Sequence, residues 1–168
     1  STIYQQVLPM NTIDTKPGFS LMIMQTNWGY TGTLNDYCRA AKKEGYDGIE
    51  VWWPGLDTGA QKELFSALKD HGLQVGFLCA GQESDAQQHL NSFKKSIDAA
   101  TSNTFQKPVY INCHSGRDYF TYDQNKLLID YTEQKKKETG IPIYHETHRS
   151  RMMYAGHVAR NFIEKHPS

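Results

Sequence analysis

Apolar residues along this chain gather in five short runs, and a stretch with helical periodicity follows each run. The runs lie at residues 19–25, 47–53, 73–80 and 107–114, with a last one that begins at residue 141. They contain mostly Ile, Val, Leu, Phe, Met, Tyr and Trp, and they are apolar on both faces. Such runs are typical of strands that are buried in a parallel sheet.

The stretches between these runs predict helices through their caps and their apolar stripes. Ala86, Leu90, Phe93 and Ile97 keep a helical spacing, and Tyr154, Val158 and Phe162 predict a last helix. Another helix is expected at about residues 60–71. The expected N-caps are Thr33, Ser84 and Asp123, and the glycines expected to end helices are Gly45, Gly72 and Gly140.

The order of these elements predicts an α/β fold with five βα units. Strands begin roughly every 30 residues, which is the length of one βα unit. Two architectures fit this order, an open doubly wound sheet or part of a (β/α)8 barrel. The residues after the first run are Gln25-Thr-Asn-Trp-Gly-Tyr-Thr-Gly32, which is not the glycine-rich loop that binds dinucleotide phosphates. A dinucleotide-binding doubly wound sheet is therefore poorly supported. We expect an N-terminal arm at residues 1–18 and one α/β domain at residues 19–168.

Composition narrows the class of protein. The 168 residues include 18 Lys and Arg against 18 Asp and Glu, so the net charge is zero and a nucleic-acid partner is not expected. No apolar run approaches the roughly 18 residues of a membrane span, so we expect a soluble chain without a membrane partner. The chain starts at Ser1, which leaves a cytoplasmic location and a periplasmic one, after removal of a signal peptide, both open.

The most informative segment is the last apolar run, which ends abruptly in Glu146, His148 and Arg149. A carboxylate and imidazoles at a strand end can hold a divalent metal or move protons between the carbons of a polyol. The alternative for Glu146 is a salt bridge to Arg149 or Arg151. In extended chain, His148 points to the same side as Glu146, whereas His145 points to the opposite side and is expected to pack there.

Further candidate residues lie at the ends of other predicted strands. His114 is expected either to contact a substrate or to form a structural hydrogen bond. His148 is expected either to contact a substrate hydroxyl or to support a neighbouring group. Glu50 is expected at the site or in a buried ion pair. Trp53, together with Trp28 and Trp52, is expected to stack on a sugar or to pack in the core or a loop. The carboxyl ends of parallel strands are where barrels and open sheets place their active sites.

Three motifs in order resemble one family. Gly45-Tyr-Asp-Gly-Ile-Glu-Val51, Cys113-His-Ser-Gly116 and His145-Glu-Thr-His-Arg149 resemble strand-two, strand-four and strand-five motifs of the xylose-isomerase-like TIM-barrel superfamily. That superfamily includes sugar phosphate isomerases and epimerases, inosose dehydratases and nucleases of the endonuclease IV type. The match covers about residues 19–166, so the resemblance implies a partial (β/α)8 barrel domain at residues 19–168.

The resemblance implies a divalent-metal-dependent isomerase or epimerase that acts on a sugar, sugar phosphate or related polyol through an enediolate. It implies Glu146 as catalytic residue and metal ligand, with Mn²⁺, Mg²⁺, Co²⁺ or Zn²⁺ as cofactor. It implies His114, His148, Glu50, Trp53 and Arg149 as contacts for a small carbohydrate substrate. A lyase or dehydratase on the same substrates stays open, as does a homo-oligomer. A nuclease is disfavoured because strand three, Phe77-Leu-Cys-Ala-Gly81, ends without histidine.

Such barrels have eight βα units, and this sequence supplies five. The family's other metal ligands come from strands six, seven and eight, so the remaining ligands are expected outside this sequence. Two interpretations follow: the sequence is a fragment of a longer protein, or another chain completes the barrel. A non-catalytic barrel fragment that binds sugar or serves in an assembly is the alternative to an enzyme.

Overall fold

The computed structural model describes residues 18–55 and 57–166 as an α/β fold with a five-stranded parallel sheet. The strands are β1 (Met24–Thr26), β2 (Gly48–Trp52), β3 (Gln74–Ala80), β4 (Tyr110–His114) and β5 (Ile143–His145). The helices are α1 (Leu34–Lys43), α2 (Thr58–His71), α3 (Ala86–Ser102), α4 (Tyr122–Thr139) and α5 (Gly156–Lys165). The predicted fold class is thereby confirmed, while residues 1–17 of the predicted arm lie outside the described residues.

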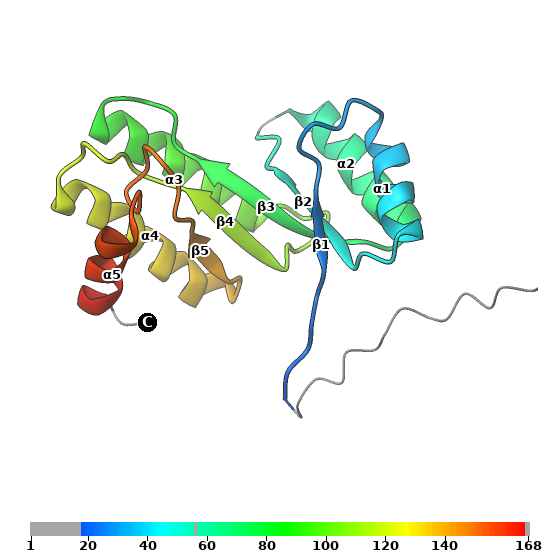
Figure 1. The fold of residues 1–168 in the computed structure, drawn as a ribbon. Coiled ribbons are helices and arrows are strands. Elements are labelled where there is room, and N and C mark those ends of the chain that lie inside the picture. Colours follow the sequence, from blue (N-terminus) through cyan, green and yellow to red (C-terminus); the bar gives the residue numbers. More distant parts are fainter. Residues whose placement is uncertain (1–17, 56, 167–168) are drawn as a thin grey trace, which may run out of the picture.

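The sheet has the strand order β1-β2-β3-β4-β5, so each strand pairs with its neighbour in sequence. Every pair is parallel. In a doubly wound sheet the order reverses at a switch point, whereas strands of a barrel follow one another in sequence. This order therefore supports the barrel-like architecture of the two that the sequence allowed. Figure 1 shows α1 and α2 beside the β1–β2 end of the sheet, and α3 and α4 beside the β3–β5 end.

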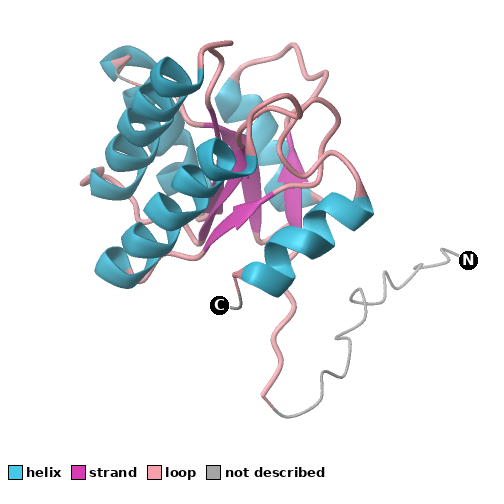
Figure 2. Ribbon diagram, turned by 90° about the vertical axis from the view of Figure 1, so that its left-hand side faces the viewer, coloured by secondary structure: helices cyan, strands magenta, loops and turns pink. Residues whose placement is uncertain are grey.

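The hydrophobic core lies between these helices and one face of the sheet (Figure 2). Alternate strand residues point into it, because successive side chains of a strand face opposite sides. The strand residues of this helix-covered face are Ile49, Val51, Val75, Phe77, Cys79, Ile111, Cys113 and Ile143. Cys79 and Cys113 are register partners that are both buried, and burial raises the pKa of the Cys79 thiol to about 12. None of the described helices is long and apolar enough to cross a membrane.

Strand β1 is shorter than the predicted run at residues 19–25. Within the described residues it is an edge strand that pairs only with β2, and its register begins at Met24 opposite Gly48. The backbone N–H of Ile23 donates instead to the Asp47 carboxylate, at 2.7 Å. The apolar side chains before it stay exposed, namely Phe19, Leu21, Met22 and Ile23.

Two predicted N-caps are wrong by one or two residues, and one helix starts later than predicted. Asp85, not Ser84, caps α3, because its carboxylate accepts from the N–H groups of Gln87 and Gln88. Thr121, not Asp123, caps α4 in a capping box with Gln124. Tyr154 precedes α5 and is exposed, whereas Phe162 is buried against α4. The N-cap Thr33 and the terminal glycines Gly72 and Gly140 are confirmed.

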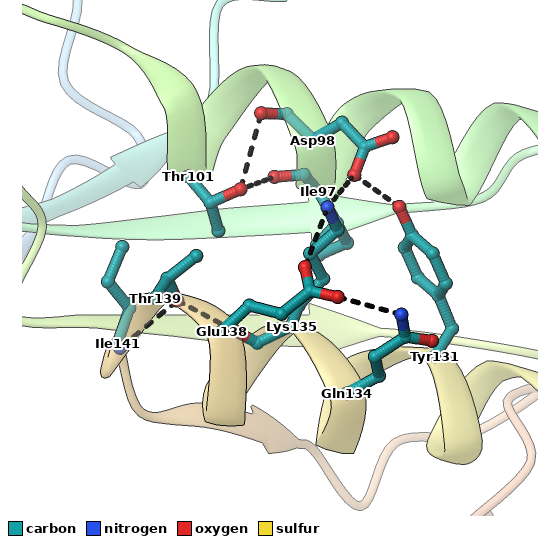
Figure 3. A network of polar contacts seen from close by, with 9 residues as sticks. All are labelled: Ile97, Asp98, Thr101, Tyr131, Gln134, Lys135, Glu138, Thr139 and Ile141. Atoms are coloured by element: carbon teal, nitrogen blue, oxygen red, sulfur yellow. Dashed lines mark hydrogen bonds and ion pairs between the residues drawn. The ribbon is translucent and has the colours of Figure 1, made fainter.

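A polar network joins α3 to α4 at the surface (Figure 3). Lys135 Nζ lies 2.9 Å from Asp98 Oδ1 and 3.3 Å from Glu138 Oε2, and the Tyr131 hydroxyl donates to Asp98. Burial, with the Asp98 carboxylate close by, raises the pKa of Tyr131 to about 12. Exposed ion pairs of this kind are worth about 0–1 kcal/mol, so the buried apolar contacts carry the α3–α4 packing.

His145 connects β5 to the β4–α4 loop and to α4 through hydrogen bonds. Its Nδ1 lies 2.6 Å from Ser115 Oγ, and its Nε2 lies 2.7 Å from Thr132 Oγ1. Thr132 donates its own hydroxyl hydrogen to the carbonyl of Ile129, so the Nε2–H of His145 donates to Thr132. Burial lowers the pKa of this imidazole from 6.5 to about 4. His145 therefore packs away from Glu146, as its place in the strand predicts.

We expect the stability of the fold to fall between pH 7 and pH 5 through His145. Below pH 6.5 the imidazole of His145 becomes protonated in the unfolded chain. In the folded chain it stays neutral until the pH approaches its lowered pKa of about 4. The free energy of unfolding is therefore highest above pH 6.5 and declines toward pH 4, with about 2 kcal/mol lost at pH 5. Urea unfolding at both pH values measures this loss. The variant H145Q should show a shallower pH dependence, and an unchanged slope would contradict the assignment.

Candidate functional site

The face of the sheet opposite the helix-covered face carries polar and aromatic side chains. In register across β2, β3, β4 and β5 stand Trp52, Leu78, Asn112 and Tyr144. We call this the second face of the sheet. Trp52 and Tyr144 are 43% and 55% exposed, which places them at a surface rather than in a core. These two aromatic rings are therefore open to a ligand.

Glu146 follows β5 and is held by two donors from β4. Its Oε2 accepts from Asn112 Nδ2 at 2.8 Å and from His114 Nε2 at 2.9 Å. A carboxylate can only accept, so the Nε2 of His114 carries the hydrogen. The His114 side chain is 5% exposed and that of Glu146 is 37% exposed. The two hydrogen bonds fix the position of Oε2, and the Glu146 side chain stays partly open to solvent.

Two rings flank His114. The imidazole of His148 stacks on it with ring centroids 4.7 Å apart, and Trp52 meets it edge-on at 5.3 Å. His148 and Glu146 thus both reach His114, in agreement with their two-residue spacing. The Nδ1–H of His148 donates to the carbonyl of Arg149 at 2.7 Å, which fixes the orientation of the ring. We call these five residues, Trp52, Asn112, His114, Glu146 and His148, the Glu146 cluster.

Glu50 lies on the same face, one step nearer the amino ends of the strands. Its Oε2 accepts from the Tyr110 hydroxyl at 2.7 Å. The register aligns Glu50 with Gly76 and Gly76 with Tyr110, so the tyrosine side chain crosses β3 over a residue without a side chain. Burial and the Glu50 carboxylate raise the pKa of Tyr110. Glu50 therefore forms part of the floor beneath the Glu146 cluster.

The structure separates two predicted site residues from this cluster. Trp53 is 9% exposed and packs against Phe77, with ring centroids 4.9 Å apart, on the helix-covered face. Its neighbour Trp52 reaches His114 instead. Arg149 is exposed in the loop after β5 and contributes its carbonyl to His148. The salt bridges of the described residues do not include one between Glu146 and Arg149 or Arg151.

Sequence reasoning did not assign a role to Asn112 or Tyr110, and it did not separate Trp52 from Trp53. The signal that identifies them is the two-residue alternation of the strands, counted from His114 and Glu50. His114 and Asn112 lie two residues apart, as do Asn112 and Tyr110, and both donors reach Glu146. Knowing which of Trp52 and Trp53 faces the helices requires the register of β2, which the sequence leaves open by one residue.

A metal centre is not complete within the described chain. Among residues 18–55 and 57–166, no three His, Cys, Asp or Glu side chains are grouped so that they could hold a metal ion. Glu146 is the candidate ligand, but one of its oxygens already accepts two hydrogen bonds. The arrangement by itself offers a carboxylate that can exchange a proton, beside imidazoles and an aromatic ring.

Comparison with known proteins adds no identity to this geometry. No protein-family model matches the chain, and no curated protein matches its sequence. The resemblance to the xylose-isomerase-like superfamily therefore stays a prediction that depends on the three motifs at strands two, four and five.

Replacing Gly76 with Ala should break the contact between Tyr110 and Glu50. The added Cβ would lie 2.5 Å from Tyr110 Cζ, so the ring must move. Forcing an extra methyl group into a packed site costs about 1–3 kcal/mol, which urea unfolding measures. G156A is the matched control, because nothing lies within 4 Å of a Cβ added there. In a Y110A background G76A should cost little, and an equal cost in both backgrounds would contradict this account.

Proposed function

We propose that this chain belongs to a sugar isomerase or epimerase in which Glu146 exchanges a proton with a carbon of the substrate. The observation that supports the proposal is the position of Glu146 at the carboxyl end of a parallel strand, held by Asn112 and His114. Barrel enzymes place their catalytic groups at this end of the sheet. A carboxylate there, partly open to solvent, is suited to remove a proton next to a carbonyl group.

The neighbouring groups fit a small polyhydroxy substrate. Trp52 presents an exposed indole beside His114, and sugars bind to aromatic faces through their C–H surfaces. His148 stacks on His114 and is partly exposed, so its Nε2 is available to a substrate hydroxyl. His114 is a positioning residue, because its own Nε2–H is committed to Glu146. The proposed partner is therefore a small carbohydrate.

The divalent metal that the resemblance implies does not fit the described residues by themselves. Of the ligands expected, these residues supply Glu146 alone, and they form no group of three metal-binding side chains. Further ligands would have to come from outside the described residues, in the same chain or another copy. We therefore derive the proton transfer from Glu146 and assign no step to a metal.

The exposed indole of Trp52 and the partly exposed ring of His148 also support a second candidate. In that candidate the two rings bind a sugar, and Glu146 exchanges no proton with it. A lyase or dehydratase would start with the same proton removal as the isomerase. The lyase or dehydratase is distinguished from an isomerase by its product, and the sugar-binding chain by forming none.

The test is the exchange of substrate hydrogen with solvent. The full chain is incubated in D₂O with a panel of aldoses, ketoses and their phosphates, with and without Mn²⁺, Mg²⁺, Co²⁺ or Zn²⁺. Deuterium incorporation, followed by NMR, should fall roughly 100-fold or more in E146Q, because a positioned acid–base group contributes about that much. E63Q is the control, since Glu63 is exposed on α2. Exchange that persists in E146Q would overturn the proposal, and sugar binding without exchange would favour the second candidate.

A further inference from the structure

Two arginine side chains from different loops donate to adjacent backbone carbonyls just after the carboxyl end of β3. Arg151, in the loop after β5, donates from Nη1 to the carbonyl of Gly81 at 2.8 Å. Arg117, in the loop after β4, donates from Nη2 to the carbonyl of Gln82 at 2.5 Å. Gly81 and Gln82 are consecutive, and consecutive Cα atoms are about 3.8 Å apart. The two guanidinium groups are therefore neighbours.

These two positive charges are not compensated by the described chain. Arg151 is 8% exposed, and the Nε of Arg117 is buried without a hydrogen-bond partner. In the described ranges, neither guanidinium group pairs with a carboxylate. Burial, and then the charge of Arg117, lower the pKa of Arg151. Buried charges are normally paired, so a buried and a half-buried guanidinium group side by side, with no carboxylate partner among the described residues, point to an anion that those residues do not supply.

The other titratable groups nearby do not supply it. The Glu83 carboxylate is engaged by the hydroxyl of Ser92 and by the N–H of Gln82, at 3.1 Å for the latter. His89 accepts from the N–H of Gly116 through Nε2 at 3.1 Å and donates from Nδ1 to the carbonyl of Glu83, so it is neutral. Neither residue forms an ion pair with the arginines.

We propose that Arg117 and Arg151 bind the phosphate group of a phosphorylated sugar. The forked guanidinium group matches phosphate oxygens in pairs, and two such groups side by side bind a dianion. The proposal rests on the proposed function, because it assigns this anion to the substrate of the Glu146 cluster. Arg117 lies three residues after His114, and His114 is the register partner of Ala80, which precedes Gly81. Neighbouring strands are about 4.8 Å apart, so the two arginines and the Glu146 cluster lie at the same end of adjacent strands.

The test compares the binding of a phosphorylated pentose, the same pentose without phosphate, and inorganic phosphate. Isothermal titration of the full chain is run with EDTA, so that no metal contributes. The phosphorylated sugar should bind at least about tenfold more tightly than the free sugar. The affinity of R117Q for the phosphorylated sugar should be about tenfold lower than that of the wild type. R160Q is the matched control, because Arg160 is exposed on α5 and pairs with Glu164 at 2.6 Å. R117K, which keeps the charge but not the fork, should fall between R117Q and the wild type.

The outcomes separate this inference from the proposed function. Equal affinities for the phosphorylated and the free sugar would overturn the phosphate site, as would R117Q that binds like R160Q. Tighter binding of a sugar acid than of the sugar phosphate would also overturn it, in favour of a carboxylate ligand. Thermal unfolding of each variant shows that the fold is retained. The loss of deuterium exchange in E146Q is expected whichever of these results is obtained, because that exchange depends on a different residue.

Discussion

The division of each strand into a helix-covered face and a second face is the constraint on which the rest of the structure depends. Helices α1–α4 bury every other strand residue, from Ile49 on β2 to Ile143 on β5. The residues between them have to face the other way, because the side-chain period of a strand is two. Asn112 and His114 are thereby directed to the side on which Glu146 stands. A slip of one residue in β4 would put Cys113 in their place and leave Glu146 without either donor.

Buried polar side chains then hold the loops that carry the site. His145 joins Ser115 of the β4–α4 loop to Thr132 of α4, and His89 joins Gly116 of the same loop to the β3–α3 loop. A Cβ at Gly116 would lie 2.2 Å from Asn125 Oδ1, so this loop is closely packed. Both histidines have lowered pKa values with burial as the main cause, so they act as neutral hydrogen-bonding groups. The loops around Glu146 are therefore positioned by contacts that the catalytic proposal does not use.

The sequence predicts the elements better than it predicts the site. Apolar runs and terminal glycines locate the five strands and the ends of α2 and α4, because these signals are local. The start of β1 is not predictable in the same way, since pairing with β2 decides which apolar residues become strand. Of the site residues, Glu146, His114 and His148 come together as the strand ends suggest. Trp52 in place of Trp53 depends on the register of β2, and Arg151 on Gly81 depends on a contact across 70 residues of sequence.

Opposite charges lie at different places along the carboxyl ends of the strands. The chain as a whole is neutral, with 18 basic and 18 acidic residues. Glu146 stands next to β5, whereas the guanidinium groups of Arg117 and Arg151, which form no ion pair within the described residues, lie over the end of β3. His114 on β4 stands between them, bonded to the carboxylate through Nε2. A ligand that is anionic at one end and gives up a proton at the other would meet the matching group at each end, which is why the two proposals concern one substrate.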